Sequence, residues 1–331
     1  MPNMMKATEF KAEPPGHAYD DLLNRCRALA PLVTSVVFPC EATALAGAVE
    51  AAHARLITPT FVGPRQKIQE VAREAGLNIS SFEIEDVPDA PTAAAKAVEA
   101  VRAGRAEVLM KGSLHTDELM AAVVATGTGL RTSRRISHAF VMAVPNYPKP
   151  LIVTDAVVNI APSLEEKRDI CQNAIDLAHC LGQSAPKVAI LSAVEEVTTR
   201  IPSTIDAAAL CKMADRGQIT GAILDGPLAM DNAISFDAAK TKGLVSAVAG
   251  DADILVVPNI EAGNILAKQF IFLANADAAG VVLGARVPVI LTSRADSVRT
   301  RMASCGVALL LAHAYRSASL VDACRTSSLD G

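Results

Sequence analysis

The sequence predicts an α/β protein built around a largely parallel β-sheet that is wrapped by helices. Short β-branched apolar runs alternate with segments whose apolar residues recur at helical spacing, and glycine or proline residues separate many of them. The last of these runs is apolar at nearly every position, as expected for a strand buried on both faces of a parallel sheet. Polar residues follow directly at the ends of several runs, where α/β proteins place their ligands.

An N-terminal arm, residues 1–18, is expected to be loose, and regular alternation follows it. Helices are predicted at residues 19–29, 42–54, 65–75 and 92–102, and strands at 33–38, 57–62, 82–84 and 107–110. Thr116 is placed to start a further helix. Two apolar runs, 137–144 and 151–154, flank a proline-rich turn and predict a hairpin-like crossing. Alternation then resumes, with helices at 164–181, 205–214, 264–274 and 298–314, strands at 188–191, 221–224, 254–257, 281–283 and 287–291, and a frayed tail at 325–331.

Composition and charge exclude several classes of protein. The 331 residues are 51% apolar and 20% charged, which is typical of a globular protein rather than a disordered one. A net charge of -4 without a basic run argues against nucleic acid or an anionic membrane surface as a partner. Seven scattered cysteines and six scattered histidines favour a reduced cytoplasmic location and predict neither disulfides nor a metal site. Neither a signal peptide nor a membrane-spanning stretch is predicted.

The most informative stretch is the last predicted strand with the residues after it, 287–298. The apolar run ends there in Ser293, Arg294 and Asp296, so one strand end offers a hydroxyl, a guanidinium and a carboxylate. Two interpretations are open, and they are compatible. Ser293 and Asp296 can form the N-terminal cap of the next helix, and the same helix start can bind phosphate oxygens.

Polar groups also follow other predicted strands. The residues concerned are Lys111, Gly112 and Ser113 after one strand, Arg131 and Arg134 in a glycine-rich basic loop, Asp155 and Asp225 at two further strand ends, and Asn259, Glu261 and Asn264 after another. Each group also has an ordinary structural explanation, such as a capped helix start, a solvated basic loop, a turn, or a charged first helical turn capped by Asn264. Because so many strand ends share this polar character, the sequence predicts one shared crevice.

Six stretches carry a resemblance to a known family. They read Met110-Lys-Gly-Ser113, Gly129-Leu-Arg-Thr-Ser-Arg134 followed by Ser137-His138, Thr154-Asp-Ala-Val-Val-Asn-Ile-Ala161, Asp225-Gly-Pro-Leu-Ala-Met-Asp-Asn232, Gly250 to Asn264, and Leu291-Thr-Ser-Arg-Ala-Asp296. In order and kind they resemble the phosphate acetyltransferase and phosphate butyryltransferase family, over about residues 20–315.

The resemblance implies two doubly wound α/β domains, similar in architecture to the isocitrate and isopropylmalate dehydrogenases, with the active cleft between them. Residues 1–147 and 288–331 would form domain I, and residues 148–287 would form domain II. The implied reaction interconverts a short-chain acyl-CoA, acetyl- or butyryl-CoA, plus phosphate with acyl phosphate plus CoA. Coenzyme A is then a substrate, no cofactor or metal is bound, the partners are acyl-CoA, phosphate and acyl phosphate, and the protein is a homodimer.

The chemistry of this reaction assigns roles to the 293–296 stretch. Attack by a thiol whose pKa is about 8.5 is helped by a carboxylate base, for which Asp296 is the first candidate. The Ser293 hydroxyl or neighbouring backbone N–H groups would stabilise the oxyanion, and Arg294 would hold the phosphate. The family's Ser-Arg pair maps onto Ser293 and Arg294. Its acetyl branch carries the catalytic aspartate seven residues after the serine, where this chain has Thr300, so Asp296 would have to substitute.

A second departure from the family pattern concerns an arginine of the acetyl branch. It is replaced by Leu119-Met120 here, and Arg131, Arg134 or Arg135 would supply the missing charge.

Three other functions are alternatives to this one. A phosphate acyltransferase that uses long acyl chains on a carrier protein would need a basic docking patch, which the acidic balance disfavours. A catalytically inactive acyl-CoA-sensing domain of the same family is the non-enzymatic alternative. A metal- and NAD-dependent dehydrogenase is disfavoured because no dinucleotide fingerprint is present. The acyl chain length is not predicted.

Overall fold

The computed structural model describes residues 17–293 and 296–327, with side chains described for 19–293 and 296–317. Its strands within these ranges are β1 (Leu32–Val37), β2 (Ile57–Gly63), β3 (Glu83–Asp86), β4 (Val108–Lys111), β5 (Ser137–Ala143), β6 (Leu151–Thr154), β7 (Lys187–Leu191), β8 (Ile223–Leu228), β9 (Ile254–Val256), β10 (Asp277–Leu283) and β11 (Val289–Ile290). They form one sheet in the order β3-β2-β1-β4-β11-β10-β5-β6-β9-β7-β8.

The sheet consists of two parallel halves joined by antiparallel strands. Pairing is parallel from β3 to β11 and again from β6 to β8. Between them β10 runs antiparallel to both β11 and β5, and β5 runs antiparallel to β6. The predicted α/β class and the predicted hairpin-like crossing of β5 and β6 are confirmed. The two halves share one continuous sheet across the positions at which the sequence predicts a domain junction.

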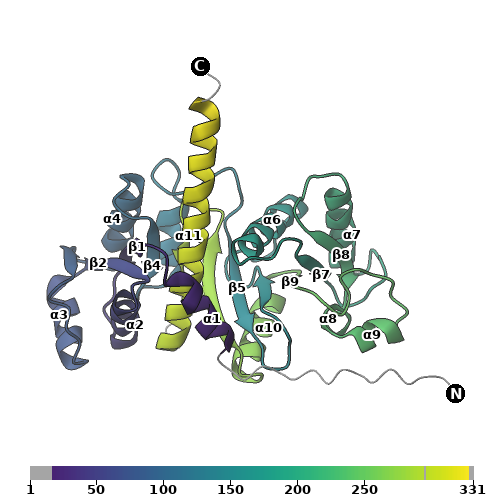
Figure 1. Cartoon of the computed structure of the whole chain (residues 1–331), viewed down its shortest axis with the longest axis horizontal. Coiled ribbons are helices and arrows are strands. Elements are labelled where there is room, and N and C mark those ends of the chain that lie inside the picture. The colour runs from purple at the N-terminus through teal and green to yellow at the C-terminus, as the bar shows by residue number, and fades with distance from the viewer. Residues whose placement is uncertain (1–16, 294–295, 328–331) are drawn as a thin grey trace.

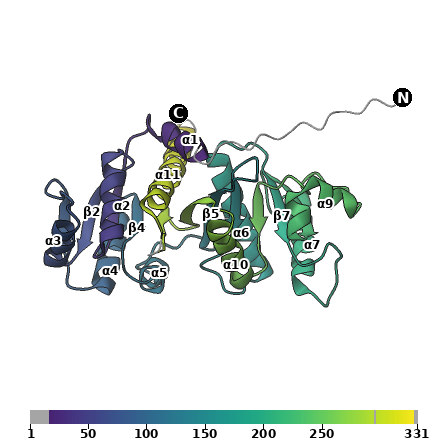
Figure 2. The same ribbon diagram turned by 90° about the horizontal axis from the view of Figure 1, so that it is seen from below.

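Helices cover both faces of the sheet (Figure 1). They are α1 (His17–Cys26), α2 (Ala42–His53), α3 (Arg65–Glu74), α4 (Ala90–Arg102), α5 (Thr116–Val124), α6 (Leu164–Cys180), α7 (Pro202–Asp215), α8 (Met230–Ile234), α9 (Phe236–Thr241), α10 (Ile260–Phe272) and α11 (Val298–Ser327). One face packs on α1, α2, α3, α6, α7 and α11, and the other on α4, α5, α8, α9 and α10. Seen from below, α5 and α10 flank the middle of the sheet, one from each half (Figure 2).

The two halves meet on the face that α5 and α10 cover. Val157, in the loop after β6, packs against the apolar cluster that contains Leu291 of the first half. The same side chain packs against the cluster that contains Val257 of the second half. The loop after β6 therefore lies between the end of β11 and the start of α10, which brings strand ends from both halves together.

Local sequence explains several helix starts. Ser163 accepts a hydrogen bond from the Glu166 N–H at 3.3 Å while the Glu166 carboxylate accepts the Ser163 N–H at 2.9 Å, a reciprocal capping box for α6. Asp89 accepts the Thr92 N–H at 2.8 Å and so caps α4. Both caps satisfy donors that the first helical turn leaves without partners.

Four predicted details are wrong. Asp225 does not end its strand, because β8 continues through Pro227 to Leu228; β8 lies at the edge of the sheet, where a residue without an N–H is tolerated. Helix α10 starts at Ile260 rather than at 264, since Asn259 supplies the cap. Helices α8 and α9 were not predicted, because five and six residues are too short for periodicity to register. Helix α11 continues through Ser327, past the predicted start of a tail, while residues 1–16 and 328–331 lie outside the described residues.

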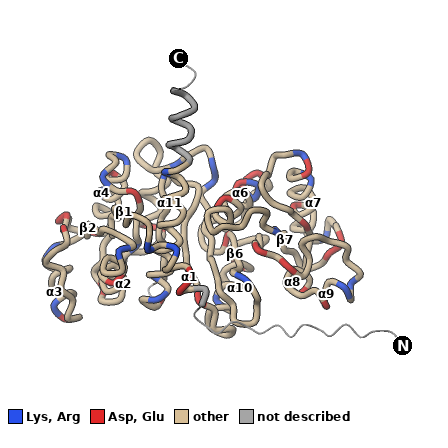
Figure 3. The backbone as a smooth tube through the Cα atoms, viewed as in Figure 1, with Lys and Arg blue, Asp and Glu red and all other residues tan. Residues whose placement is uncertain are grey.

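Charges of both signs are spread over both halves (Figure 3). Within the described residues, each helix lacks either the length or the apolar composition that crossing a membrane requires.

Candidate active site

The end of β4 packs closely against the chain that leaves β1. A Cβ added to Gly112 would come within 2.3 Å of the Val37 carbonyl oxygen and 2.5 Å of the Phe38 carbonyl oxygen, so only glycine fits there. Ser113 donates from its hydroxyl to the Phe38 carbonyl oxygen at 2.8 Å and accepts the Cys40 N–H at 3.1 Å. Gly112 and Ser113 thus fix the position of the preceding residue, Lys111.

Lys111 is a buried cation at the centre of the candidate site. Lys111 is only 4% exposed, and its Nζ lies 3.4 Å from the carbonyl oxygen of Gly112 and 3.4 Å from that of Thr292. Thr292 follows β11, so Lys111 connects the ends of two neighbouring parallel strands. On this side of the sheet Lys111 thus lies against the residue that precedes Ser293, and its charge acts on the carboxyl of Asp296.

Ser293 and Asp296 contact each other after β11. The Ser293 N–H donates to Asp296 Oδ2 at 2.6 Å, and the Asp296 N–H donates to the Ser293 carbonyl oxygen at 3.2 Å. The side-chain cap of α11 is supplied by Ser297, whose hydroxyl accepts the Thr300 N–H at 3.1 Å. The interpretation of Ser293 as the N-cap of α11 is therefore wrong by four residues. Arg294 lies outside the described residues.

Electrostatics around Asp296 are mixed. Burial raises the pKa of its carboxyl, and this effect outweighs the Ser293 N–H and the positive charges of Arg301 and Lys111, which lower it. A carboxylate whose pKa is raised is a stronger base than an exposed aspartate. The charges of Arg301 and Lys111 therefore both influence the protonation of Asp296, which lies beside Ser293.

Arg301 is a part of this site that the sequence did not predict. It lies in the first turns of α11, is 1% exposed, and donates from Nη1 to Thr292 Oγ1 at 2.7 Å and from Nη2 to the Ser293 carbonyl oxygen at 2.8 Å. A signal was present in the sequence. The buried face of α11 includes Cys305, Leu309 and Ala312, and Arg301 precedes Cys305 by one helical repeat, so the periodicity places a cation on an otherwise apolar face.

His138 lies where the two halves meet. Its ring is fully buried, packs edge-on against Phe140 with ring centroids 4.4 Å apart, and makes no hydrogen bond of good geometry within the described part of the chain. A Cβ on Gly280 would come within 3.0 Å of the His138 Nε2 and 2.7 Å of the Leu291 carbonyl oxygen. Burial lowers the pKa of the imidazole to about 3, although the Leu291 carbonyl acts in the opposite direction. The ring is neutral at physiological pH.

Asp155 organises the loop after β6. It is 3% exposed and accepts the backbone N–H groups of Val157, Val158 and Asn159 at 2.9, 3.0 and 3.2 Å, together with the Asn159 side-chain amide at 2.5 Å. The His138 backbone N–H also favours its ionised form, but burial is the largest effect and raises the pKa of the carboxyl. Its carboxylate therefore holds the loop in shape.

The glycine-rich basic loop lies against α6 rather than against Lys111 or Ser293. Arg134 pairs with Asp176 at 2.9 Å, and Arg135 pairs with Glu166 at 2.8 Å. Arg135 also donates from Nε to Asn159 Oδ1 at 2.7 Å, which connects the basic loop to the loop after β6. Arg131 is exposed and lines a shallow depression of about 210 Å³ together with acidic residues of α6.

The remaining predicted site residues divide into two groups. Asn259 caps α10 by accepting the Ala262 N–H at 2.9 Å, and Asn264, which the sequence proposed as the cap, instead donates to the Ala156 carbonyl oxygen at 3.2 Å. Glu261 stands in the first turn of α10 beside them. Asp225 is separate from this group, because β8 lies at the edge of the sheet with β7 and β9 between it and β6.

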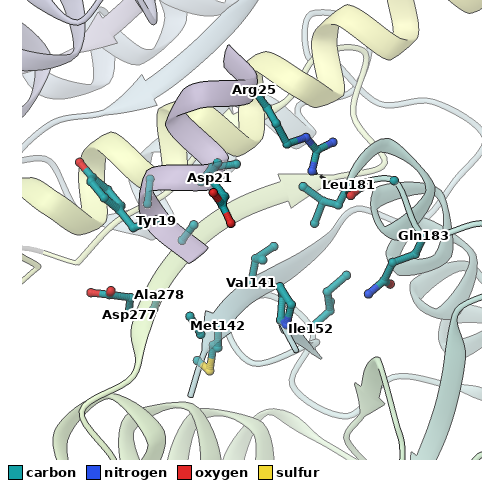
Figure 4. Close-up of a pocket in the computed structure, with 16 residues that line it drawn as sticks. Tyr19, Asp21, Arg25, Val141, Met142, Ile152, Leu181, Gln183, Asp277 and Ala278 are labelled. Carbon is teal, nitrogen blue, oxygen red and sulfur yellow. Dashed lines mark hydrogen bonds between the residues drawn. The ribbon is translucent and has the colours of Figure 1, made fainter. Parts of the chain in front are cut away.

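A cavity of about 310 Å³ lies apart from all these residues, between α1 and the sheet (Figure 4). Its floor is made by apolar side chains of β5, β6 and β10, and Tyr19, Asp21, Arg25 and Gln183 stand at its rim. Within the described residues, no group of histidine, cysteine, aspartate and glutamate side chains has an arrangement that could hold a metal ion.

Comparisons with known proteins agree on one family. The model of a family described as phosphate acetyl/butaryl transferase matches residues 89–309. A phosphate acetyltransferase of Rhizobium meliloti is 63% identical over 302 residues, 91% of this chain and 96% of that protein. A phosphate butyryltransferase of Clostridium beijerinckii is 40% identical over 294 residues, 89% of this chain and 97% of that protein. The crystal structure of a branched-chain phosphotransacylase from Enterococcus faecalis V583 matches with a TM-score of 0.74 at 29% identity, over 85% of this chain and 99% of that one.

Proposed function

Since the chain belongs to the phosphate acetyl/butyryl transferase family, we propose that it interconverts a short-chain acyl-CoA plus phosphate with acyl phosphate plus CoA. The chain is an acyltransferase, as its motifs predicted. Relatives named for acetyl transfer and for butyryl transfer both match most of its length, and the relative at 63% identity is an acetyltransferase. We therefore favour the acetyl group as the preferred acyl chain.

One observation supports placing the reaction at the end of β11. Ser293 has its backbone fixed on both sides, by the Asp296 carboxylate at its N–H and by Arg301 at its carbonyl oxygen, with the buried cation Lys111 beside Thr292. A site held by several hydrogen bonds to its supporting residues needs little rearrangement during reaction, which is how enzymes stabilise developing charge.

The proposed step needs no covalent intermediate on the protein. In the direction of acyl-CoA synthesis, the CoA thiol loses its proton to Asp296 and the thiolate sulfur attacks the carbonyl carbon of the acyl phosphate in a ternary complex. The Ser293 hydroxyl donates to the oxyanion, because the Ser293 N–H is already engaged with Asp296. The bond from carbon to the phosphate oxygen then breaks, phosphate leaves, and Arg294 with Lys111 stabilises its charge.

Binding roles are proposed for the surrounding predicted residues. Gly112 and Ser113 would shape the phosphate end of the site, and Arg131 and Arg134 would attract the phosphates of CoA. The second half would supply the other side of the binding site. Two observations support this: Asn264 donates to the loop that Asp155 organises, and Asn259 and Glu261 stand at the start of the same helix. Asp225 has the least structural support as a substrate ligand.

The test of the proposed function is the initial rate of thiol release from C2, C3 and C4 acyl-CoAs in the presence of phosphate or arsenate. We expect acetyl-CoA to react fastest, and absence of turnover with all three would remove the proposal. Ser293→Ala should lower kcat by roughly 100-fold, as the loss of one oxyanion donor commonly does. Ser297→Ala is the matched control, because it removes a hydroxyl that caps α11 without touching Ser293.

Four further expectations belong to the proposal. We expect a homodimer, which light scattering would test, and a cytoplasmic location, which cell fractionation would test. The purified chain should be active without added cofactor or metal, as an assay after dialysis against a chelator would show. Limited proteolysis would test the division into one domain of residues 1–147 with 288–331 and a second of residues 148–287.

A further inference from the structure

We propose that Arg301 is a positioning residue for acyl transfer, whose guanidinium holds the Thr292-Ser293 turn in the geometry that the reaction uses. This inference rests on the proposed role of Ser293. It adds a residue that lies eight positions away from Ser293 in the sequence and acts through the backbone and through the side chain of Thr292.

Arg301 holds two consecutive residues of one turn, although its Nε is buried without a hydrogen-bond partner in the described part of the chain. Nη1 reaches the Thr292 hydroxyl at 2.7 Å and Nη2 reaches the Ser293 carbonyl oxygen at 2.8 Å, so one planar group spans two consecutive residues. Because the guanidinium is rigid, two such bonds fix the orientation of the turn as well as its distance from α11. Asp296 then holds the Ser293 N–H from the other side.

Neighbouring residues hold the Arg301 side chain in place. Its aliphatic part lies on Gly47 of α2, where an added Cβ would come within 2.5 Å of the Arg301 Cδ. A buried charge is costly unless it is paired: burial lowers the pKa of this guanidinium, and the carboxylates of Asp296 and Glu41 oppose that shift. Apolar residues would fill the same space at lower cost, so we assign the buried charge a function at the turn.

A positioning role predicts effects on turnover more than on substrate affinity. Arg301→Lys keeps the charge, but an ammonium group is a point donor and does not reproduce a fork across two acceptors. We expect kcat to fall by roughly 10- to 100-fold, since a displacement of about 1 Å can cost about 100-fold in rate, while KM for acyl-CoA changes by less than about threefold. Arg299→Lys is the matched control, because Arg299 lies two residues away and pairs with Asp277 instead, and its kcat should stay within about twofold of wild type.

A second pair of variants keeps the proposal testable if Arg301→Lys fails to fold. Thr292→Val removes only the hydroxyl that accepts from Nη1, and Thr292→Ser keeps it. We expect Thr292→Val to lose about tenfold in kcat and Thr292→Ser to recover most of that loss. The double variant Arg301→Lys/Thr292→Val should have about the kcat of Arg301→Lys alone, because the bond to Thr292 is one of the two that Arg301 makes to the turn.

The outcomes separate this inference from the proposed function. If Ser293→Ala is inactive while folded Arg301→Lys and Thr292→Val both keep kcat within about twofold of wild type, the positioning role of Arg301 is refuted. The proposed catalytic role of Ser293 is then kept. If Ser293→Ala keeps full activity, the proposed role of Ser293 fails first. If Arg299→Lys lowers kcat as much as Arg301→Lys, the effect belongs to α11 in general and the inference is overturned.

Discussion

Replacing Asp296 with asparagine is the sharpest test of the assigned base. The Asp296 carboxylate lies 2.6 Å from the Ser293 nitrogen, and an asparagine has nearly the same shape and can still accept that N–H through its amide oxygen. The variant therefore removes the charge and the proton-accepting ability while keeping the turn. A positioned general base commonly contributes about 10²- to 10⁴-fold in rate, so kcat should fall by at least about 100-fold, or about 3 kcal/mol of barrier.

Stability should change in the opposite direction. The pKa of Asp296 is raised in the folded protein, chiefly by burial, so its contribution favours folding below the pKa of the unfolded chain and is lost as pH rises through the folded value. At neutral pH the ionised carboxylate is thus a net cost to the fold, and asparagine should leave the melting temperature equal or higher. We would measure kcat with acetyl-CoA and phosphate beside a thermal melt. A folded variant that keeps more than about a tenth of wild-type kcat would show that Asp296 only shapes the turn.

Three further predictions follow from the same contacts. Gly280→Ala places a Cβ within 2.7 Å of the Leu291 carbonyl oxygen and 3.0 Å of the His138 ring, so we expect a lower melting temperature together with lower kcat; an unchanged pair would contradict the described packing. The pKa of the His138 imidazole is about 3 in the folded protein. Below the pKa of the unfolded chain, this difference lowers the free energy of unfolding by about 1.4 kcal/mol per pH unit, so His138→Gln should flatten that decline between pH 6.5 and 5. Urea unfolding at several pH values measures this, and equal slopes would count against a neutral buried ring. Asn259→Ala removes the cap of α10 and should cost about 1 kcal/mol in the same urea assay, whereas Asn259→Ser should restore most of it.

The sequence predicts the alternation of helices and strands well because period and turn residues are local properties. It predicts the hairpin of β5 and β6 because two apolar runs and their proline-rich turn are contiguous. It does not predict where α10 starts, because Asn259 and Asn264 are both competent caps and only packing against Ala156 decides between them. Short helices such as α8 carry too few residues for a period to register.

Of the candidate site, the sequence predicts the residue types at strand ends but not their relative placement. Lys111 and Thr292 meet because β4 and β11 are neighbours in the sheet, and that neighbourhood depends on strand order rather than on spacing along the chain. Asp225 resembled the other strand-end acids in sequence, yet β8 is at the sheet edge. The contact of Arg301 with Ser293 depends on how α11 packs against the end of β11, which periodicity alone does not specify.

Geometry also bears on the departure from the family pattern at position 300. Thr300 stands in the first turn of α11, where its N–H and hydroxyl both contact the Ser297 hydroxyl, so the residue serves the helix start. Asp296 precedes that helix and shares its surroundings with Lys111 and Arg301. An acid at position 300 would add charge at the helix start, whereas an acid at position 296 lies against the backbone of Ser293 itself. The second place would keep a carboxylate beside the proposed reacting groups while leaving the helix cap intact, and the buried Arg301 supplies positive charge near it.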